Sequence, residues 1–243
     1  MRHGQRSLVV LSGGLDSTVT SAIAKTESSE VHGISFAYGQ RHGKMELGQA
    51  VEVAKNLNFA SHQFVRVPFN ENFFQGKTSL VTGDNNSFTV PEPTVKGSEE
   101  GTIPSTWVPQ RNMLFLTYAM GYADTIEAEY IYTGFNAVDY SGYPDCRPEF
   151  VEAAETALNL ARKRFVEEDH TIIIKTPIID YTKSMIVKEG LALGAPIHLS
   201  YSCYYGGEQA CGKCDSCRIR LEAFSDLGLT DPIAYEVPGG NDA

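Results

Sequence analysis

The chain has 243 residues, of which 42% are hydrophobic and 21% are charged, a composition typical of a globular protein with one large domain and a small attachment. Its net charge of -10 argues against a broad nucleic-acid-binding surface, which needs clustered Lys and Arg, but it allows a small anionic ligand in a local basic pocket. The apolar run at the N-terminus is too short for a signal peptide and no stretch is long enough for a membrane span, so we expect a cytoplasmic protein with no membrane partner.

The first predicted element is a buried strand over residues 7–11, which ends at a Ser-Gly-Gly turn and is followed by a helix over 16–25. A strand that leads through glycines into a helix directs several backbone N–H groups and the positive end of the helix dipole to one point, which suits a phosphate. Asp16 can cap the helix or hold Mg²⁺. The residues expected to bind the nucleotide are Leu11, Ser12, Gly13, Gly14, Leu15, Asp16, Ser17 and Thr18, with Ser12, Asp16 and Ser17 expected at the reacting phosphate.

This loop differs from the two commonest phosphate-binding loops. No lysine follows it as in G-x-x-x-x-G-K-[ST], and Gly13-Gly14 do not fit G-x-G-x-x-G. Ser-Gly-Gly-x-Asp-Ser instead resembles the pyrophosphate-binding loop of ATP pyrophosphatases, which activate carbonyl groups by adenylation. The alternative is an ordinary strand-to-helix turn that contains Ser and Gly.

Strands and helices alternate along the rest of the large domain. We expect strands over 31–36, 64–67, 130–133 and 172–175, and helices over 44–57, 113–123, 148–165 and 183–193. Strands that are apolar nearly throughout predict a parallel sheet covered on both faces, a Rossmann-like α/β domain over residues 1–198. Residues 70–106 lack periodicity and are rich in Gly, Pro and Asn, which indicates either a lid or a plain surface insertion.

Polar residues follow the second and fourth predicted strands, where an open parallel sheet binds its ligands. The loop over residues 134–147 carries two carboxylates, two tyrosines and an arginine, which could hold a planar, hydrogen-bonding ring. Its alternative is a Gly-Tyr-Pro-Asp turn at the surface. Arg41 or Arg111 could pair with a substrate carboxylate or an ATP phosphate, although a solvated arginine is the usual outcome for either one.

Four of the five cysteines lie close together near the C-terminus. Cys203-x7-Cys211-x2-Cys214-x2-Cys217 offers four thiolates, which match a closed tetrahedral zinc site of the structural kind. An iron–sulfur cluster and a redox Cys-x-x-Cys pair are the alternatives. Residues 199–243, with a short helix over 216–227, are too few to form a core of their own, and a bound metal would supply one. Cys146 stands apart and is expected to be a small buried residue.

Five motifs together resemble one family, the 7-cyano-7-deazaguanine synthases of the queuosine pathway. They are residues 12–17, 38–42, 108–112, 139–147 and the four-cysteine tail, so that the likeness extends from about residue 8 to 221. Gln110 departs from the family pattern, in which we expect Gly or another small residue. The resemblance implies an ATP-dependent carbon–nitrogen ligase that converts 7-carboxy-7-deazaguanine and ammonia to the nitrile, through an adenylated carboxylate and an amide.

The same resemblance implies the ligands and the roles of individual residues. ATP and Mg²⁺ would bind at the first loop, with Arg111 beside the nucleotide, and Zn²⁺ would be structural. The partners would be small molecules rather than a nucleic acid, and a homodimer is compatible with the family. The residues expected around the deazaguanine are Tyr38, Gln40, Arg41, Asn112, Asp139, Tyr143 and Asp145.

Two other classes of function use the same phosphate loop. A tRNA-thiolating or lysidine-type enzyme would need a basic surface for tRNA, which the composition does not provide. A nucleotide-sensing domain without catalytic activity would have no reason to place a ring-binding loop opposite the ATP site.

Overall fold

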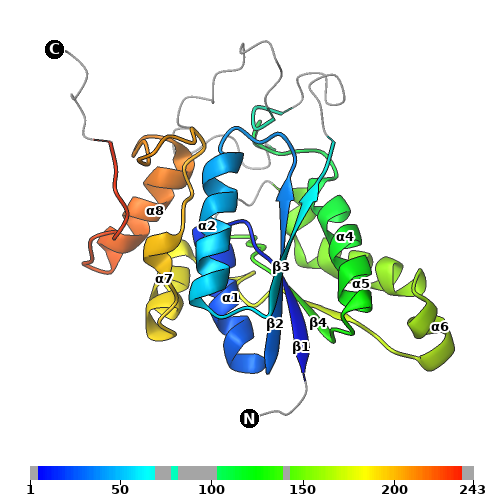
Figure 1. The fold of residues 1–243 in the computed structure, drawn as a ribbon. Coiled ribbons are helices and arrows are strands. Elements are labelled where there is room, and N and C mark those ends of the chain that lie inside the picture. Colours follow the sequence, from blue (N-terminus) through cyan, green and yellow to red (C-terminus); the bar gives the residue numbers. More distant parts are fainter. Residues whose placement is uncertain (1–4, 69–77, 82–102, 139–142, 237–243) are drawn as a thin grey trace.

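The computed structural model describes residues 5–68, 78–81, 103–138 and 143–236 (Figure 1). Within them, five strands form one sheet in the order β3-β2-β1-β4-β5, and every neighbouring pair is parallel. The strands are β1 (Arg6–Val10), β2 (Glu30–Ala37), β3 (Ser61–Arg66), β4 (Tyr130–Thr133) and β5 (Ile173–Lys175). The prediction of a Rossmann-like α/β fold is therefore confirmed.

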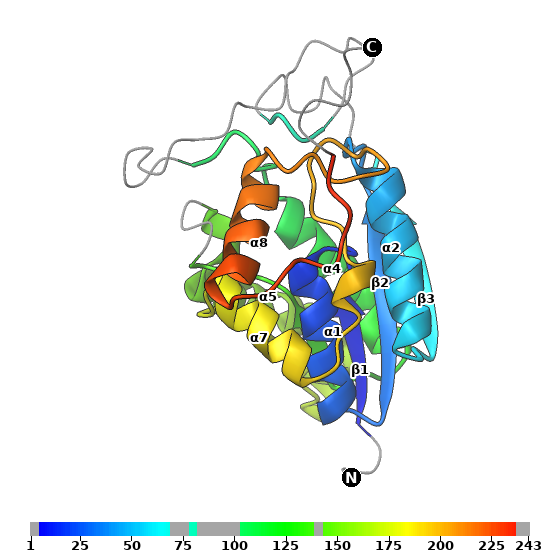
Figure 2. The same ribbon diagram turned by 90° about the vertical axis from the view of Figure 1, so that its left-hand side faces the viewer.

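Helices cover both faces of the sheet (Figure 1). One layer contains α1 (Leu15–Glu27), α2 (Gly43–Asn56) and α7 (Lys183–Ala192), and the other contains α4 (Arg111–Thr125) and α5 (Pro148–Leu160). Helix α8 (Asp215–Asp226) packs beside α7 on the outside of the first layer (Figure 2). The short elements are α6 (Lys163–Glu168), η1 (Pro144–Cys146) and η2 (Ile197–Leu199). No helix among the described residues is long and apolar enough to cross a membrane.

The central strand explains why the sheet needs two helical layers. Leu8 and Val9 of β1 are both fully buried, although successive side chains of a strand point to opposite faces. Leu8 packs into the core that includes Leu116 of α4, whereas Val9 packs into the core that includes Val19 of α1. A strand that is apolar at consecutive positions is stable only when both faces are covered, as the sequence indicated.

The prediction of a single helix over residues 148–165 is wrong. Helix α5 ends at Leu160 and α6 begins at Lys163, because Arg162 adopts an extended backbone between them. The Arg162 guanidinium is buried, and it donates to Asp124 Oδ1 at 3.0 Å, to Asn159 Oδ1 at 2.8 Å and to the His170 carbonyl at 3.0 Å. The helical periodicity of the sequence continues through Arg162, but these tertiary contacts stabilise the break between α5 and α6 more than the periodicity favours a continuous helix.

The third strand begins three residues earlier than residues 64–67 suggested, because β3 lies at the edge of the sheet and tolerates polar residues. His62 Nε2 lies 2.7 Å from Ser35 Oγ on β2, and the Phe64 side chain on β3 is half exposed. Most of the predicted insertion over 70–106 lies outside the described residues. Of its described part, Leu80 and Val81 are buried, and Val81 forms an antiparallel bridge with Gln40.

Candidate nucleotide and substrate site

A cavity of about 270 Å³ opens at the carboxyl edge of the sheet. The strand order reverses between β1 and β4, and the segments that follow these two strands line the cavity together with residues that follow β2. An open parallel sheet binds its ligands at this reversal point. The predicted site residues that line the cavity are Leu11, Ser12, Gly14, Leu15, Asp16, Ser17, Tyr38, Gln40, Arg111, Asn112 and Tyr143.

The backbone of the first loop presents N–H groups that a phosphate could take over. The N–H groups of Ser12 and Gly13 donate to the Ser17 hydroxyl at 3.3 and 3.2 Å, and that of Leu15 donates to the Ser202 hydroxyl at 3.5 Å. These are long hydrogen bonds to hydroxyl groups rather than to carbonyls of a helix or sheet. An anionic oxygen at the start of α1 would be a stronger acceptor for the same N–H groups.

Two glycines allow the rest of the structure to approach this loop closely. Gly13 has φ +87°, and a Cβ placed on it would lie 2.3 Å from the Glu46 carbonyl oxygen in α2. A Cβ on Gly134, just after β4, would lie 2.9 Å from the Ser17 nitrogen. Because both contacts involve backbone atoms, neither position accepts a side chain without a shift of the loop.

Asp16 forms an ion pair that the sequence did not indicate. Lys183 Nζ, at the first position of α7, lies 2.7 and 2.9 Å from the two carboxylate oxygens of Asp16, and both residues line the cavity. Asp16 lies in the first turn of α1, whereas Gly14 is the cap residue. The sequence does contain a signal for Lys183. It is the first residue of the helix that follows the fifth strand, and the preceding Thr182 caps this helix by accepting a hydrogen bond from Met185 N.

Buried polar and aromatic side chains form the wall opposite the first loop. The side-chain oxygen of Gln40 accepts from the Tyr38 N–H at 2.8 Å, and its amide donates to the Phe36 carbonyl at 3.1 Å, which fixes the turn after β2. The rings of Phe36 and Phe115 stack with their centres 4.1 Å apart. Burial raises the pKa of Tyr143 to about 12, so this phenol is neutral at physiological pH.

Three residues predicted to bind ligands are not among the residues that line this cavity. Asp145 does not line the cavity: its carboxylate accepts from Trp107 Nε1 at 3.2 Å and from the Asn112 N–H at 3.4 Å, at the start of α4. Arg41 is also absent from the cavity wall, and the buried Thr18 hydroxyl donates to the Gly14 carbonyl.

Two further predicted residues, Gly13 and Asp139, differ from these three. Gly13 shapes the loop through its backbone and is not a lining residue of the cavity. Asp139, the other carboxylate considered for the ring, lies outside the described residues.

His42 and Glu46 form a second pair at the cavity that the sequence did not indicate. His42 Nε2 lies 3.2 Å from Glu46 Oε1, and the Gln40 amide donates to the other carboxylate oxygen at 3.3 Å. Burial alone lowers the pKa of His42, but the Glu46 carboxylate outweighs this effect, so the pKa of His42 is raised. The Glu46 carboxylate therefore favours the protonated form of His42, which lines the cavity.

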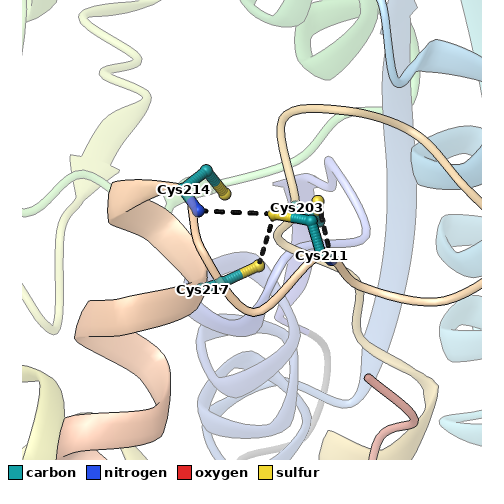
Figure 3. A group of neighbouring side chains, drawn as sticks. All are labelled: Cys203, Cys211, Cys214 and Cys217. Atoms are coloured by element: carbon teal, nitrogen blue, oxygen red, sulfur yellow. Dashed lines mark hydrogen bonds between the residues drawn. The ribbon is translucent and has the colours of Figure 1, made fainter. Parts of the chain in front are cut away.

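The four cysteines come together as the sequence predicted (Figure 3). The sulfur atoms of Cys203, Cys211, Cys214 and Cys217 all lie within 4.8 Å of one another and are largely buried. The N–H groups of Lys213 and Cys214 both donate to Cys211 Sγ at 3.3 Å. Several thiolates in one buried place repel each other unless a cation lies between them, so the cluster fits a bound metal ion.

Cys146 is separate from this cluster. Its thiol is buried, and it accepts a hydrogen bond from the Asn112 side-chain amide at 3.3 Å. Burial raises its pKa to about 12, so the thiol stays protonated. The expectation of an unreactive buried cysteine agrees with this environment.

The parallel sheet and the glycine loop at its reversal point define an α/β protein with a Rossmann-like fold and a cavity at the carboxyl ends of its strands. The family model described as queuosine biosynthesis protein QueC matches residues 6–228, and the chain belongs to this family.

Curated relatives match almost the whole chain. The protein of Acetivibrio thermocellus named 7-cyano-7-deazaguanine synthase is 46% identical over 233 residues, which are 95% of this chain and 98% of the relative. The protein of the same name from Oceanobacillus iheyensis is 43% identical over 235 residues, 96% of this chain and 99% of the relative. Among solved structures, an NMN synthetase from Francisella tularensis is 18% identical with a TM-score of 0.49, covering 96% of this chain and 79% of that one.

Proposed function

We propose that this protein is an ATP-dependent carbon–nitrogen ligase that converts 7-carboxy-7-deazaguanine and ammonia to 7-cyano-7-deazaguanine. The main support in the structure is that a single cavity joins the phosphate-type loop to an aromatic and polar wall. ATP on one side and a planar carboxylated ring on the other would bring the α-phosphorus and the carboxylate together. The names of the curated relatives support the same reaction.

The chemistry requires two activations of the same carbon. A carboxylate oxygen attacks the α-phosphorus of ATP, which releases pyrophosphate and leaves an acyl adenylate. Ammonia displaces AMP and yields the amide. The amide oxygen then attacks a second ATP, and loss of a proton and AMP from the adenylated imidate gives the nitrile. The protein contributes by positioning the reactants and stabilising phosphate charge, and we assign no general base.

The first loop and its neighbours supply the groups for phosphate binding. The N–H groups of Ser12, Gly13 and Leu15 and the Ser17 hydroxyl would hold the pyrophosphate unit. The Asp16 carboxylate lines the cavity beside these donors, which suits the Mg²⁺ that accompanies ATP and offsets phosphate charge. Lys183 would then exchange its contact with Asp16 for a phosphate oxygen.

We assign the four-cysteine cluster to structural Zn²⁺. Four protein thiolates complete a tetrahedral coordination sphere, so no position remains for a substrate or water. On this basis we divide the chain into an ATP-binding domain over residues 1–198 and a metal-binding segment over 199–243. We place the protein in the cytoplasm, where thiols stay reduced and ATP is supplied. A homodimer is compatible with this proposal.

One incubation tests the reaction. The protein would be mixed with ATP, ammonium and 7-carboxy-7-deazaguanine, and the products followed by mass spectrometry and by nucleotide chromatography. We expect the nitrile together with two AMP and two pyrophosphate per nitrile. ADP and phosphate as the nucleotide products would mean γ-phosphoryl transfer, and absence of the nitrile would exclude the proposed reaction.

A further inference from the structure

Arg111 is a cation at the cavity wall that has no anionic partner among the described residues. Its Nε donates to Asn112 Oδ1 at 3.2 Å, and its Nη1 donates to the Tyr38 hydroxyl at 3.3 Å. Within the described part of the chain, no carboxylate oxygen lies within 4.0 Å of the guanidinium, and Nη2 has no hydrogen-bond acceptor. Of the five N–H groups, one on Nη1 and two on Nη2 therefore remain for a ligand, enough for two hydrogen bonds to a carboxylate.

The groups around Arg111 do not cancel its charge. Burial raises the pKa of Tyr38, that of Tyr143 to about 12 and that of Cys146 to about 12, so all three are neutral at physiological pH. The Asp145 carboxylate attracts Arg111 electrostatically but lies beyond ion-pair distance. Its oxygens accept hydrogen bonds from Trp107 Nε1 and from the Asn112 N–H. Arg111 is partly buried, and a cation in such surroundings gains most from an anion that enters the cavity.

The wall beside Arg111 fits a flat ring better than a phosphate chain. Phe115 lies one helical turn further along α4, where its ring stacks on Phe36 and lies with its centre 5.4 Å from that of Tyr38. The Arg111 guanidinium itself lies 5.8 Å from the centre of the Tyr38 ring. The phosphate loop has its own N–H donors and Lys183, so Arg111 is not needed to complete it.

We propose that Arg111 binds the carboxylate of the deazaguanine and thereby selects the substrate of the first activation over that of the second. This inference rests on the proposed function. The two steps use the same ring, but the first substrate is an anion and the second is a neutral amide. A guanidinium fork gains a charge-assisted pair of hydrogen bonds with the carboxylate only.

Equilibrium binding separates the two substrates without requiring turnover. Calorimetry would measure the affinity of the wild type, Arg111→Gln and Arg111→Lys for the carboxylate, for the amide and for a non-hydrolysable ATP analogue. In Arg111→Gln we expect the carboxylate to bind roughly 10- to 150-fold more weakly, the loss expected for charged hydrogen bonds. The affinities for the amide and for the ATP analogue should change by less than about 3-fold. Arg111→Lys keeps the charge without the planar guanidinium, so its affinity for the carboxylate should lie between those of the wild type and Arg111→Gln.

A matched control is Arg6→Gln, because Arg6 pairs with Glu30 at the amino ends of β1 and β2, whereas the cavity lies at the carboxyl ends of the strands. This variant should bind all three ligands as the wild type does. The proposal would be overturned if both Arg111 variants lost the same affinity for the carboxylate and for the amide, or if they lost affinity for the ATP analogue alone. If wild-type protein binds neither the carboxylate nor the amide, the proposed function fails instead. If Arg111→Gln does not fold, the same comparison on Arg111→Lys decides the outcome.

Discussion

Replacement of Gly134 by Ala should displace the phosphate loop without removing any group from it. The added Cβ would lie 2.9 Å from the Ser17 nitrogen and 3.0 Å from the Asp16 carbonyl carbon, both of them backbone atoms. Ordinary van der Waals contact begins at about 3.4 Å, so the loop and the end of β4 must separate by roughly 0.5 Å. Such overpacking typically costs about 1–3 kcal/mol of stability.

The effect on catalysis follows from the same displacement. A misplacement of about 1 Å can lower a rate by about 100-fold, so we expect a fall in kcat/KM of about 10-fold for half that shift. The measurements are steady-state kinetics and urea unfolding of Gly134→Ala. Gly48→Ala is the matched control, because a Cβ on Gly48 in α2 meets nothing within 4 Å and should raise stability by up to about 1 kcal/mol. Wild-type kcat/KM in Gly134→Ala would refute the idea that the end of β4 sets the position of the loop.

The other predictions concern the ion pair, the start of α4 and the metal. Asp16→Ala and Ser17→Ala should each lower kcat by about 100-fold or more with the fold retained by circular dichroism, and rates within 2-fold of wild type would contradict the loop assignment. Lys183→Gln should lower kcat similarly, and its effect should not add to that of Asp16→Ala, which a double-mutant cycle measures. Gln110→Gly should raise the free energy of unfolding by about 0.5–1 kcal/mol with unchanged kcat, because Gln110 is exposed and has a left-handed backbone with φ +58°. A loss of stability would mean that the Gln110 side chain makes a compensating contact. Elemental analysis should find one zinc per chain, and Cys214→Ser should lower both zinc content and thermal stability, whereas iron with a visible chromophore would exclude the zinc assignment.

The fold could be predicted because local patterns determine it. Consecutive apolar residues such as Leu8 and Val9 require cover on both faces, and alternation with helices requires a parallel sheet. The end of α5 could not be predicted in this way. Arg162 interrupts the helix through contacts with Asp124 and His170, and neither contact is encoded in the helical periodicity of residues 148–165.

The candidate site was predictable where it depends on one stretch of sequence. The glycine turn at residues 12–14 predicts a phosphate loop by itself, and the spacing of the four cysteines predicts the cluster that the structure contains. Pairs formed by the fold were missed, since Lys183 reaches Asp16 from 167 positions away. The glycine expected in place of Gln110 has a physical explanation: the backbone at the start of α4 is left-handed, a conformation that favours glycine.

The four-cysteine segment contributes to the site even though its metal would have no open coordination position. The Tyr201 N–H donates to the Gly13 carbonyl at 2.8 Å, and the Ser202 hydroxyl accepts from the Leu15 N–H. Both residues come directly before Cys203 of the cysteine cluster. A metal that fixes Cys203 therefore also restricts the two residues that hold the phosphate loop in place. Loss of the metal would release these restraints before any catalytic group is removed, so its first consequence should be weaker nucleotide binding rather than slower chemistry. The small segment at the end of the chain thus helps to order the loop at its beginning.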